Sequence, residues 1–456
     1  MKYINLMHRL ILSFLLVLVA TFSFAQKGSN SPFSSYGIGE IGGLNHASFI
    51  GIGNSTITMV DSTTLNFYNP SSYQGLAKHQ PLFSIGVSSK FSNYSENGIT
   101  SSSNVTSIQH FAMAFPFAKR FGLAFGLKPF STRGYEFSSR IKVGADSINY
   151  VYEGTGNINE AFAGLSIKTL DYKGAKIALG ANFGYLFGQI TNSRKSGLIK
   201  TGASIYAGGI STKLIQAKSF HYNFGLTYSQ KIKENHTLAL SMVMDPLQKI
   251  NAKYEEGLFY GANVNDPRFY DTLSFNDSVN GNLSTIPTMT IGLSYELNFK
   301  ARKDKTNQLN SQIGFHLSYT MEEWSKYQNT FEPTYINTFS NSTKLTFGIQ
   351  YLPETDYIRN KAMTKFHQRI KYRTGIYQVN MPYITNGEQV KDFGTTFGFG
   401  IPIIIQNSLS SLNLGFSIGN RGTSDSNALK ERYYGFNIGI SIAPGADRWF
   451  VKRKLN

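Results

Sequence analysis

The sequence predicts an all-β protein, a transmembrane antiparallel β-barrel of about 14 strands with an N-terminal hatch in its lumen. The first observation is an alternation: from about Leu82 to Ile442, apolar or aromatic residues alternate with Gly, Ser, Thr, Asn and Lys. Successive side chains of a strand point to opposite faces, so each segment has one apolar and one polar face. The second observation is length, because many segments alternate over 9 to 14 residues. A tilted strand needs that length to cross a bilayer, whereas strands of soluble sandwiches usually have about five or six residues.

The third observation is the number and spacing of these segments. The connections after the second, fourth, sixth, eighth and twelfth segments are short, and those after odd segments are mostly longer, notably 245–285 and 323–341. Short turns on one side and long loops on the other are typical of outer-membrane barrels, and an even strand count places both termini in the periplasm. The third, fourth and sixth segments exceed the membrane thickness, so we expect them to project beyond it or to bend. The predicted strands are 82–93, 105–117, 120–141, 147–170, 175–190, 203–229, 236–245, 286–300, 310–322, 342–352, 366–378, 393–406, 411–419 and 432–442.

The N-terminus has the pattern of a secretory signal peptide, residues 1–25. Lys2 and Arg9 form a basic region before a short apolar core over residues 10–20. Ser23-Phe24-Ala25 forms a small-x-small cleavage site. Residues 26–80 are rich in Gly, Ser and Asn and lack the long alternation, which predicts a hatch or plug that borrows its core from the barrel. The barrel is expected over 81–443 and a periplasmic C-terminal tail over 444–456. No later stretch contains 18 consecutive apolar residues, so no transmembrane helix is predicted.

Composition limits the partners and cofactors. The chain contains no Cys, which excludes disulfides and thiolate metal sites, and its eight His form no metal-ligand spacing. We expect no cofactor. The formal charge of +17 suits nucleic acid in principle, but export removes that partner. Lumen, rim and turn charges near anionic head groups explain the excess, so outer-membrane lipid and lipopolysaccharide are the expected partners.

Two motifs resemble catalytic or cofactor signatures, but their surroundings do not fit. Residues 415–419 match G-x-S-x-G inside an alternating strand rather than at a strand-to-helix turn. Residues 37–42 match G-x-G-x-x-G without the flanking strand and helix of a dinucleotide site. His221 and His316 fall on the polar register and are expected to face the lumen as hydrogen-bonded residues. A hydrolase site at His316 with Glu322 or Glu323 is the alternative, and we predict that the protein is not an enzyme.

Proline interrupts the alternation at Pro129 in the third predicted strand and at Pro402 in the twelfth. Proline cannot donate to the hydrogen-bond ladder, so each marks a bulge, a kink or a local gap. The two interpretations are a bend at the rim and a side opening in the wall.

Four passages give the chain its resemblance to a known family: Ser31-Pro32-Phe33-Ser34-Ser35-Tyr36-Gly37-Ile38-Gly39, Asn69-Pro70-Ser71, Thr396-Phe397-Gly398-Phe399-Gly400-Ile401-Pro402, and Gly419-Asn420-Arg421-Gly422-Thr423 with the later Asp447-Arg448-Trp449-Phe450-Val451-Lys452-Arg453-Lys454. In them the chain resembles the FadL-like outer-membrane transport family, in the form common in bacteria with type IX secretion. The usual family element is Asn-Pro-Ala, so Ser71 stands where Ala is expected.

The resemblance implies a fourteen-stranded barrel whose hatch carries Asn69, Pro70 and Ser71. It implies uptake of hydrophobic small molecules that leave sideways through a kink in the third strand, and Pro129 lies where that kink falls. The alternative is a non-enzymatic accessory or plug barrel of the type IX secretion system, partnered with a larger outer-membrane protein.

Overall fold

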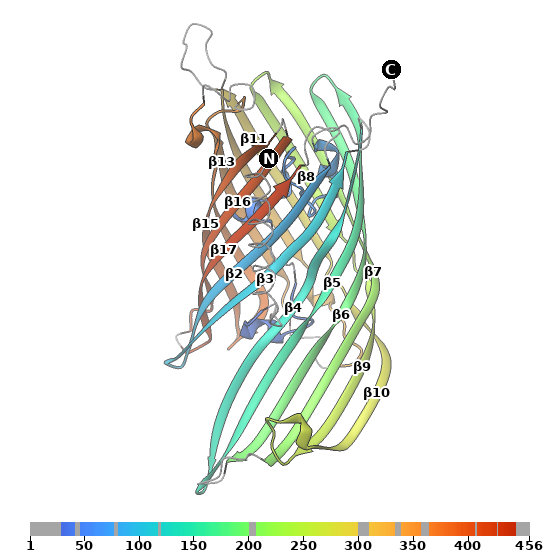
Figure 1. Ribbon diagram of the computed structural model, residues 1–456, viewed down its shortest axis with the longest axis vertical. Helices are drawn as coiled ribbons and strands as arrows, with labels where there is room; N and C mark the ends of the chain where they lie inside the picture. Colours follow the sequence, from blue (N-terminus) through green and yellow to red (C-terminus); the bar gives the residue numbers. More distant parts are fainter. Residues whose placement is uncertain are drawn as a thin grey trace, which may run out of the picture.

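A closed antiparallel barrel of fourteen strands forms the body of the computed structural model (Figure 1). The structure describes residues 29–41, 46–76, 81–116, 120–199, 207–299, 310–332, 339–356, 364–405, 408–425 and 427–443, so the predicted signal peptide and C-terminal tail lie outside it. Each strand pairs with the next along the barrel, and β17 closes the ring on β2. The fourteen are β2 (Leu82–Glu96), β3 (Ile99–Phe115), β4 (Phe121–Val143), β5 (Asp146–Tyr172), β6 (Ala175–Ile199), β7 (Ala207–Lys233), β8 (His236–Asp245), β11 (Thr288–Phe299), β12 (Ser311–Glu322), β13 (Ser342–Leu352), β14 (Lys371–Thr385), β15 (Glu388–Ile405), β16 (Ser408–Gly422) and β17 (Lys430–Ile442).

The predicted fold class and strand number are confirmed, and each predicted segment corresponds to one strand. We call the end of the barrel at Leu82 and Ile442 the proximal end, and the end at Glu96 and Lys430 the distal end. Within the described part of the chain, no helix is both long and apolar enough to cross a membrane.

The distal connections differ from the prediction. Residues 97–98, 144–145 and 386–387 are two-residue turns, although longer connections were expected there. Two of them are Asn-Gly pairs with positive φ, 49° and 78° in the first and 53° and 82° in the second. Both central residues of a tight hairpin turn of this kind need positive φ, which Asn and Gly adopt readily.

Six strands form an extension beyond the distal ends of β2 and β3, visible in the lower part of Figure 1. β4 to β7 have 23, 27, 25 and 27 residues, which confirms the projection expected for three of them. The prediction ended β6 too early, at residue 190. β9 (Lys249–Gly261) and β10 (Tyr270–Ser284) form a hairpin in the predicted 245–285 loop, and β9 pairs with the distal half of β7.

The apolar face of the barrel strands points outward and the polar face inward. On β7, Phe220 is 78% exposed and Phe224 46%, whereas His221, Asn223 and Thr227 between and beyond them are buried. In the first part of β9 this polarity reverses, because Ile250, Ala252 and Tyr254 face an inner apolar cluster.

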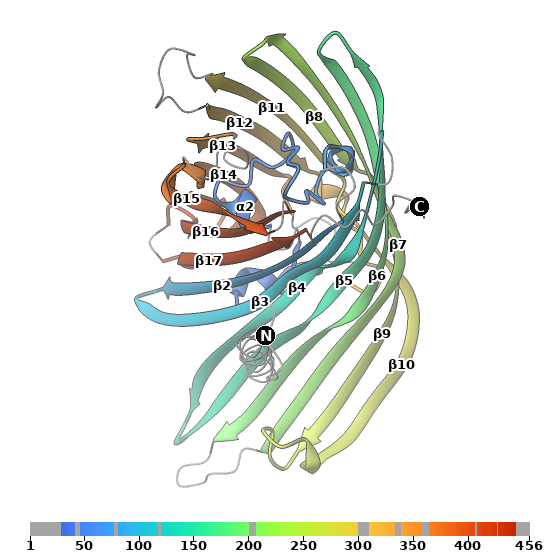
Figure 2. The same cartoon turned by 45° about the horizontal axis from the view of Figure 1, so that its top comes forward.

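The described N-terminal residues, 29–41 and 46–76, lie within the ring of strands; we call them the inner segment (Figure 2). Its short elements are η1 (Pro32–Ser35), β1 (Glu40–Ile41), α2 (Ala47–Ile50) and η2 (Pro70–Gly75). α2 packs against β15 to β17, and η2 packs against β4 to β7. In the described parts of the connections lie the short 3-10 turns η3 (Pro267–Phe269), η4 (Trp324–Lys326) and η6 (Phe366–Arg369).

Candidate functional site

The predicted hatch residues Asn69, Pro70 and Ser71 attach the inner segment to the wall at β7. The Asn69 side-chain amide donates to the Ile57 carbonyl oxygen at 2.6 Å and to Thr227 Oγ1 at 3.0 Å. Its oxygen accepts from the Ser71 amide at 3.0 Å and from Ser71 Oγ at 2.7 Å. The hydroxyls of Ser71 and Thr227 are 2.7 Å apart. Ser71 therefore uses a hydroxyl that the Ala of the family pattern lacks.

Glycines on the inner wall let the inner segment approach the strands closely. A Cβ on Gly180 of β6 would overlap the backbone at Pro70 and Ser71, and a Cβ on Gly51 would lie 2.8 Å from Gly398 Cα on β15. Only a residue without a side chain permits such backbone-to-backbone packing. The inner segment is thus fitted against opposite sides of the barrel.

The wall separates between β3 and β4 at Pro129. The two strands pair only from Phe111–Leu127 to Phe115–Leu123, near the proximal end. Distal to that pairing, β3 continues alongside β2, and β4 continues alongside β5. The β4–β5 register shifts between Pro129 and Ser131, so Phe130 is an extra residue in β4. By contrast, Pro402 pairs with Ser411 without a register shift.

Residues 29–41 of the inner segment lie along the free edge of β4. β1 pairs there, with Glu40 opposite Thr132 and Ile41 opposite Ser131. The Ser31 amide donates to the Gly134 carbonyl oxygen at 2.7 Å, and the Gly134 amide donates to Ser34 Oγ at 3.0 Å. Backbone groups of an unpaired edge need such partners when they are buried. We call these contacts the seam, because residues 29–41 pair with part of the β4 edge that β3 leaves unpaired.

A lumen cavity of about 750 Å³ adjoins the separation. Its lining includes Val105 and Ile108 from β3 and Pro129 and Phe130 from β4, so residues on both sides of the separation face one cavity. It also includes Tyr68 of the inner segment. The cavity thus extends from the inner segment to the separated wall.

Four ionisable side chains, one each from β4, β5, β7 and β8, meet beside Phe130. His221 Nδ1 lies 2.8 Å from Glu160 Oε1, and His221 Nε2 lies 2.9 Å from Asp245 Oδ2. Lys128 Nζ lies 3.2 Å from the other Glu160 oxygen. The rings of Phe130 and His221 are 5.2 Å apart. His221 is therefore the lumenal hydrogen-bonded residue that the sequence predicts, while the roles of Lys128, Glu160 and Asp245 were missed. The sequence signal that could have revealed these three residues is a charged residue at an inward-facing position of a spanning strand.

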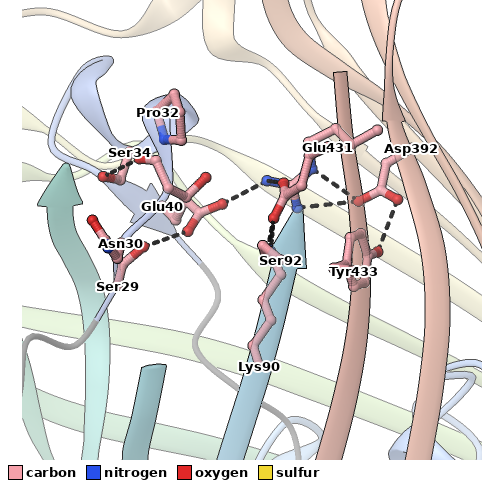
Figure 3. Close-up of polar contacts among 12 residues, drawn as sticks. Ser29, Asn30, Pro32, Ser34, Glu40, Lys90, Ser92, Asp392, Glu431 and Tyr433 are labelled. Carbon is pink, nitrogen blue, oxygen red and sulfur yellow. Dashed lines mark hydrogen bonds and ion pairs between the residues drawn. The ribbon is translucent and has the colours of Figure 1, made fainter. Parts of the chain in front are cut away.

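A second ionic cluster ties the inner segment to the distal wall (Figure 3). Arg421 Nη1 lies 2.7 Å from Glu40 Oε1, and its Nη2 lies 3.1 Å from Asp392 Oδ2. Glu431 lies 3.5 Å from the same guanidinium and 2.7 Å from Lys90 Nζ. Two cations thus pair with three carboxylates, one of which belongs to the inner segment.

An aromatic cluster covers the inner segment at the distal end. Phe33 and Tyr36 stack on Tyr383 with ring centroids 6.1 and 4.6 Å apart, and Trp324 lies 5.4 Å from Phe339. Phe33, Trp324, Phe339 and Tyr383 are all buried. The distal connection that holds Trp324 and Phe339 therefore packs on residues 33–38.

The alternative hydrolase site is not assembled. His316 is buried, with its Nδ1 3.4 Å from Thr58 Oγ1. Glu322 lies six residues further along the same strand, roughly 20 Å away. The G-x-S-x-G residues lie inside β16, as expected, and the G-x-G-x-x-G motif lies in a turn and β1, with Gly42 outside the described residues. Among the described residues, no group of three or more His, Asp or Glu side chains is arranged to hold a metal ion.

Solved structures with the same barrel layout include hydrocarbon channels. The Pseudomonas putida toluene transporter TodX matches at 13% identity over 89% of this chain and 99% of that chain, with a TM-score of 0.50. A TodX deltaS2S3 mutant, a monoaromatic hydrocarbon channel, matches at 12% identity over 85% and 97%, also with a TM-score of 0.50. A FadL homologue from Pseudomonas aeruginosa matches at 12% identity over 88% and 98%, with a TM-score of 0.49.

At these identities the likeness to TodX shows a shared fold alone, and it confirms the predicted FadL-like barrel. No curated protein matches the chain. The family model BamG matches residues 7–456, nearly the whole sequence, and the chain therefore belongs to the BamG family.

Proposed function

We propose that this protein is an outer-membrane β-barrel channel that admits hydrophobic small molecules, with a side exit at Pro129. The observation that carries the proposal is the single cavity lined by β3 and β4 on both sides of their separation. A compound in this cavity reaches the wall beside apolar side chains, including Ile108, Pro129 and Phe130. The protein passes the compound unchanged and needs no cofactor.

In this proposal, the distal end faces the outside and both termini lie in the periplasm. The inner segment is the hatch, held by Asn69 and Ser71 near the proximal end and by Glu40 near the distal end. Polar contacts of this kind are remade more readily than a packed apolar core, since water replaces each lost hydrogen bond. Movement of residues 29–41 away from β4 then widens the side exit.

Uptake into proteoliposomes tests the proposal. The probe is radiolabelled toluene, and the key variant deletes Phe130 and replaces Pro129 by Thr, which removes the extra residue of the bulge. Pro402→Thr is the matched control, because that proline causes no register shift. We expect uptake above protein-free liposomes for the parent and the control, and about tenfold slower uptake for the bulge deletion. Equal uptake by all three proteins, or no uptake above protein-free liposomes, contradicts the proposal.

A second candidate function is an accessory or plug barrel of the type IX protein secretion system. The six-stranded extension favours it, because Asp271 to Asn280 of β10 are exposed on both faces of the strand. A strand with a free edge is a natural docking surface for another protein. Stable isolation with a larger outer-membrane protein, lost when residues 262–281 are shortened, supports this function; isolation as a lone barrel under mild extraction contradicts it.

A further inference from the structure

The outer wall of β15, β16, β17 and β2 carries a basic surface directly beyond its apolar band. Ile418, Tyr434 and Phe91 are cross-strand partners and form the last apolar row on β16, β17 and β2. They are 41%, 38% and 43% exposed. The apolar run on β17, from Ile442 to Tyr434, is roughly 26 Å long along the strand. It therefore accounts for most of an apolar membrane band about 25 Å tall.

The next outward positions are polar or basic on β16, β17 and β2, whereas β15 places the exposed Phe393 opposite Asn420. Two residues beyond the apolar row, Asn420 pairs with Arg432 and Arg432 pairs with Asn93. Two residues further toward the distal end, Lys430 of β17 pairs with Ser95 of β2, and Lys391 of β15 pairs with Gly422 of β16. Because strand residues two apart are about 7 Å apart, these groups begin one side-chain layer beyond the apolar row. We call Lys391, Lys430, Arg432, Asn420, Asn93 and Ser95 the basic surface.

The basic surface lines a hollow of about 1260 Å³. Hydroxyl groups of Thr100 and Ser102 on β3 line it as well. Cations, amides and hydroxyls together are suited to a ligand that combines anionic groups with sugar hydroxyls, since each neutral group donates or accepts a hydrogen bond.

The three cations have no ion pair within 4.0 Å in the described part of the chain. The Arg432 guanidinium lies over the Tyr434 ring at 5.7 Å, which leaves its N–H groups free to bind an anion. Of the nearby carboxylates, Glu431 pairs with Lys90 and Arg421. Glu388 and Asp425 accept hydrogen bonds from neutral groups, from Ser424 Oγ at 2.6 Å and from Asn386 Nδ2 at 2.8 Å.

We infer that the basic surface binds the phosphorylated head group of a glycolipid in the membrane leaflet at the distal end. The acyl chains lie along the apolar row of Ile418, Tyr434 and Phe91, and the phosphates reach the layer of cations just beyond it. Arg presents paired donors to a phosphate, and Lys supplies a compact charge. The inference rests on the proposed membrane placement and requires no transport.

Native mass spectrometry in a neutral detergent tests this site. The probe is diphosphorylated lipid A, compared with the same lipid after removal of both phosphates, and the variant combines Lys391→Asn, Lys430→Asn and Arg432→Asn. The control combines Lys173→Asn, Lys176→Asn and Lys231→Asn, three exposed cations at the proximal end. We expect the distal variant to bind the diphosphorylated lipid about a hundredfold more weakly, and the control to bind like the parent.

Each result that would overturn the lipid site can be told apart from the others. Equal lipid binding by the distal variant and the parent overturns the site, as does equal binding of the dephosphorylated lipid. Displacement of the lipid by millimolar inorganic phosphate overturns the lipid head group in favour of a free-anion site. Unchanged heat-modifiable migration on gels shows that each variant is folded. Because the assay uses detergent, a failure here is separable from a failure of toluene uptake.

Discussion

Replacing Gly39 by Ala should open the seam between residues 29–41 and β4. Gly39 has a φ of +101°, and an added Cβ would overlap the Thr132 carbonyl oxygen and lie 2.9 Å from its carbon. Because the obstacle is backbone of β4, no side-chain adjustment relieves it. Residues 39–41 must therefore move away from the strand edge.

The contacts at risk set the magnitude. Besides the two residue pairs of β1, Ser131 Oγ donates to the Ile38 carbonyl oxygen and the Arg133 guanidinium donates to the Gly37 carbonyl oxygen. With about 1 kcal/mol for each of three or four hydrogen bonds, the free energy of local opening falls by about 3 kcal/mol. That corresponds to about a 150-fold faster exchange of the seam amides.

Hydrogen exchange measured by mass spectrometry checks this prediction. The control is Gly387→Ala, because Gly387 also has a positive φ, +82°, but has nothing within 4 Å of an added Cβ. Both variants carry a backbone penalty on the order of 1 kcal/mol, and only Gly39→Ala meets an obstacle. Faster exchange confined to residues 29–41 and 131–134 supports the seam. Equal protection of the seam amides in the two variants refutes the reasoning. It is also refuted if Gly39→Ala loses as much protection in residues 46–76 as in the seam.

Three further variants test the attachment of the inner segment. Arg421→Met should lower the free energy of unfolding in detergent by about 3–5 kcal/mol, because it leaves the buried Asp392 carboxylate without a cation; Arg268→Met, whose side chain is 84% exposed, should change it by less than about 0.5 kcal/mol. Asn69→Ala should raise exchange in residues 56–73 by an amount equivalent to about 2–3 kcal/mol, and unchanged exchange would show that its hydrogen bonds are dispensable. Burial raises the pKa of the Asp61 carboxyl, but Lys371 at 2.6 Å and hydrogen bonds from Thr63 outweigh burial and hold that pKa well below its usual value. Since the folded pKa is the lower one, the stabilisation is complete above the unfolded pKa of about 3.9 and is lost as the pH falls toward the folded value. The stability difference between the parent and Asp61→Asn should thus be constant above about pH 5 and shrink below about pH 4, and a pH-independent difference would contradict the ion pair.

Sequence alternation predicts the membrane-level strands well, since lipid outside and water or polar groups inside impose opposite demands on adjacent residues. The bounds of β8 and β13 match the prediction, and most others agree within a few residues. The alternation no longer predicts the strands where the chain extends beyond the membrane. In β10, ten consecutive residues are exposed, so nothing enforces an alternation. In the first part of β9, Ile250, Ala252 and Tyr254 point inward and the polar residues between them outward, the reverse of the membrane strands.

The candidate site was predictable only in part. Pro129 marked the place of the bulge, because proline is tolerated on an edge that lacks a ladder partner. The seam was not visible in the sequence, since it joins residues about 100 positions apart through backbone groups that every sequence has. The ionic clusters were missed for a related reason: the register places Lys128 and Glu160 inward, but only the closed barrel brings His221 and Asp245 to them.

The most direct test of the side exit compares the rate of toluene uptake into proteoliposomes for three forms of the protein. The seam variant Gly39→Ala should be faster than the parent, and the variant with Phe130 deleted and Pro129 replaced by Thr should be slower than the parent. Equal rates in the three forms would contradict a route between β3 and β4, whatever else the barrel does.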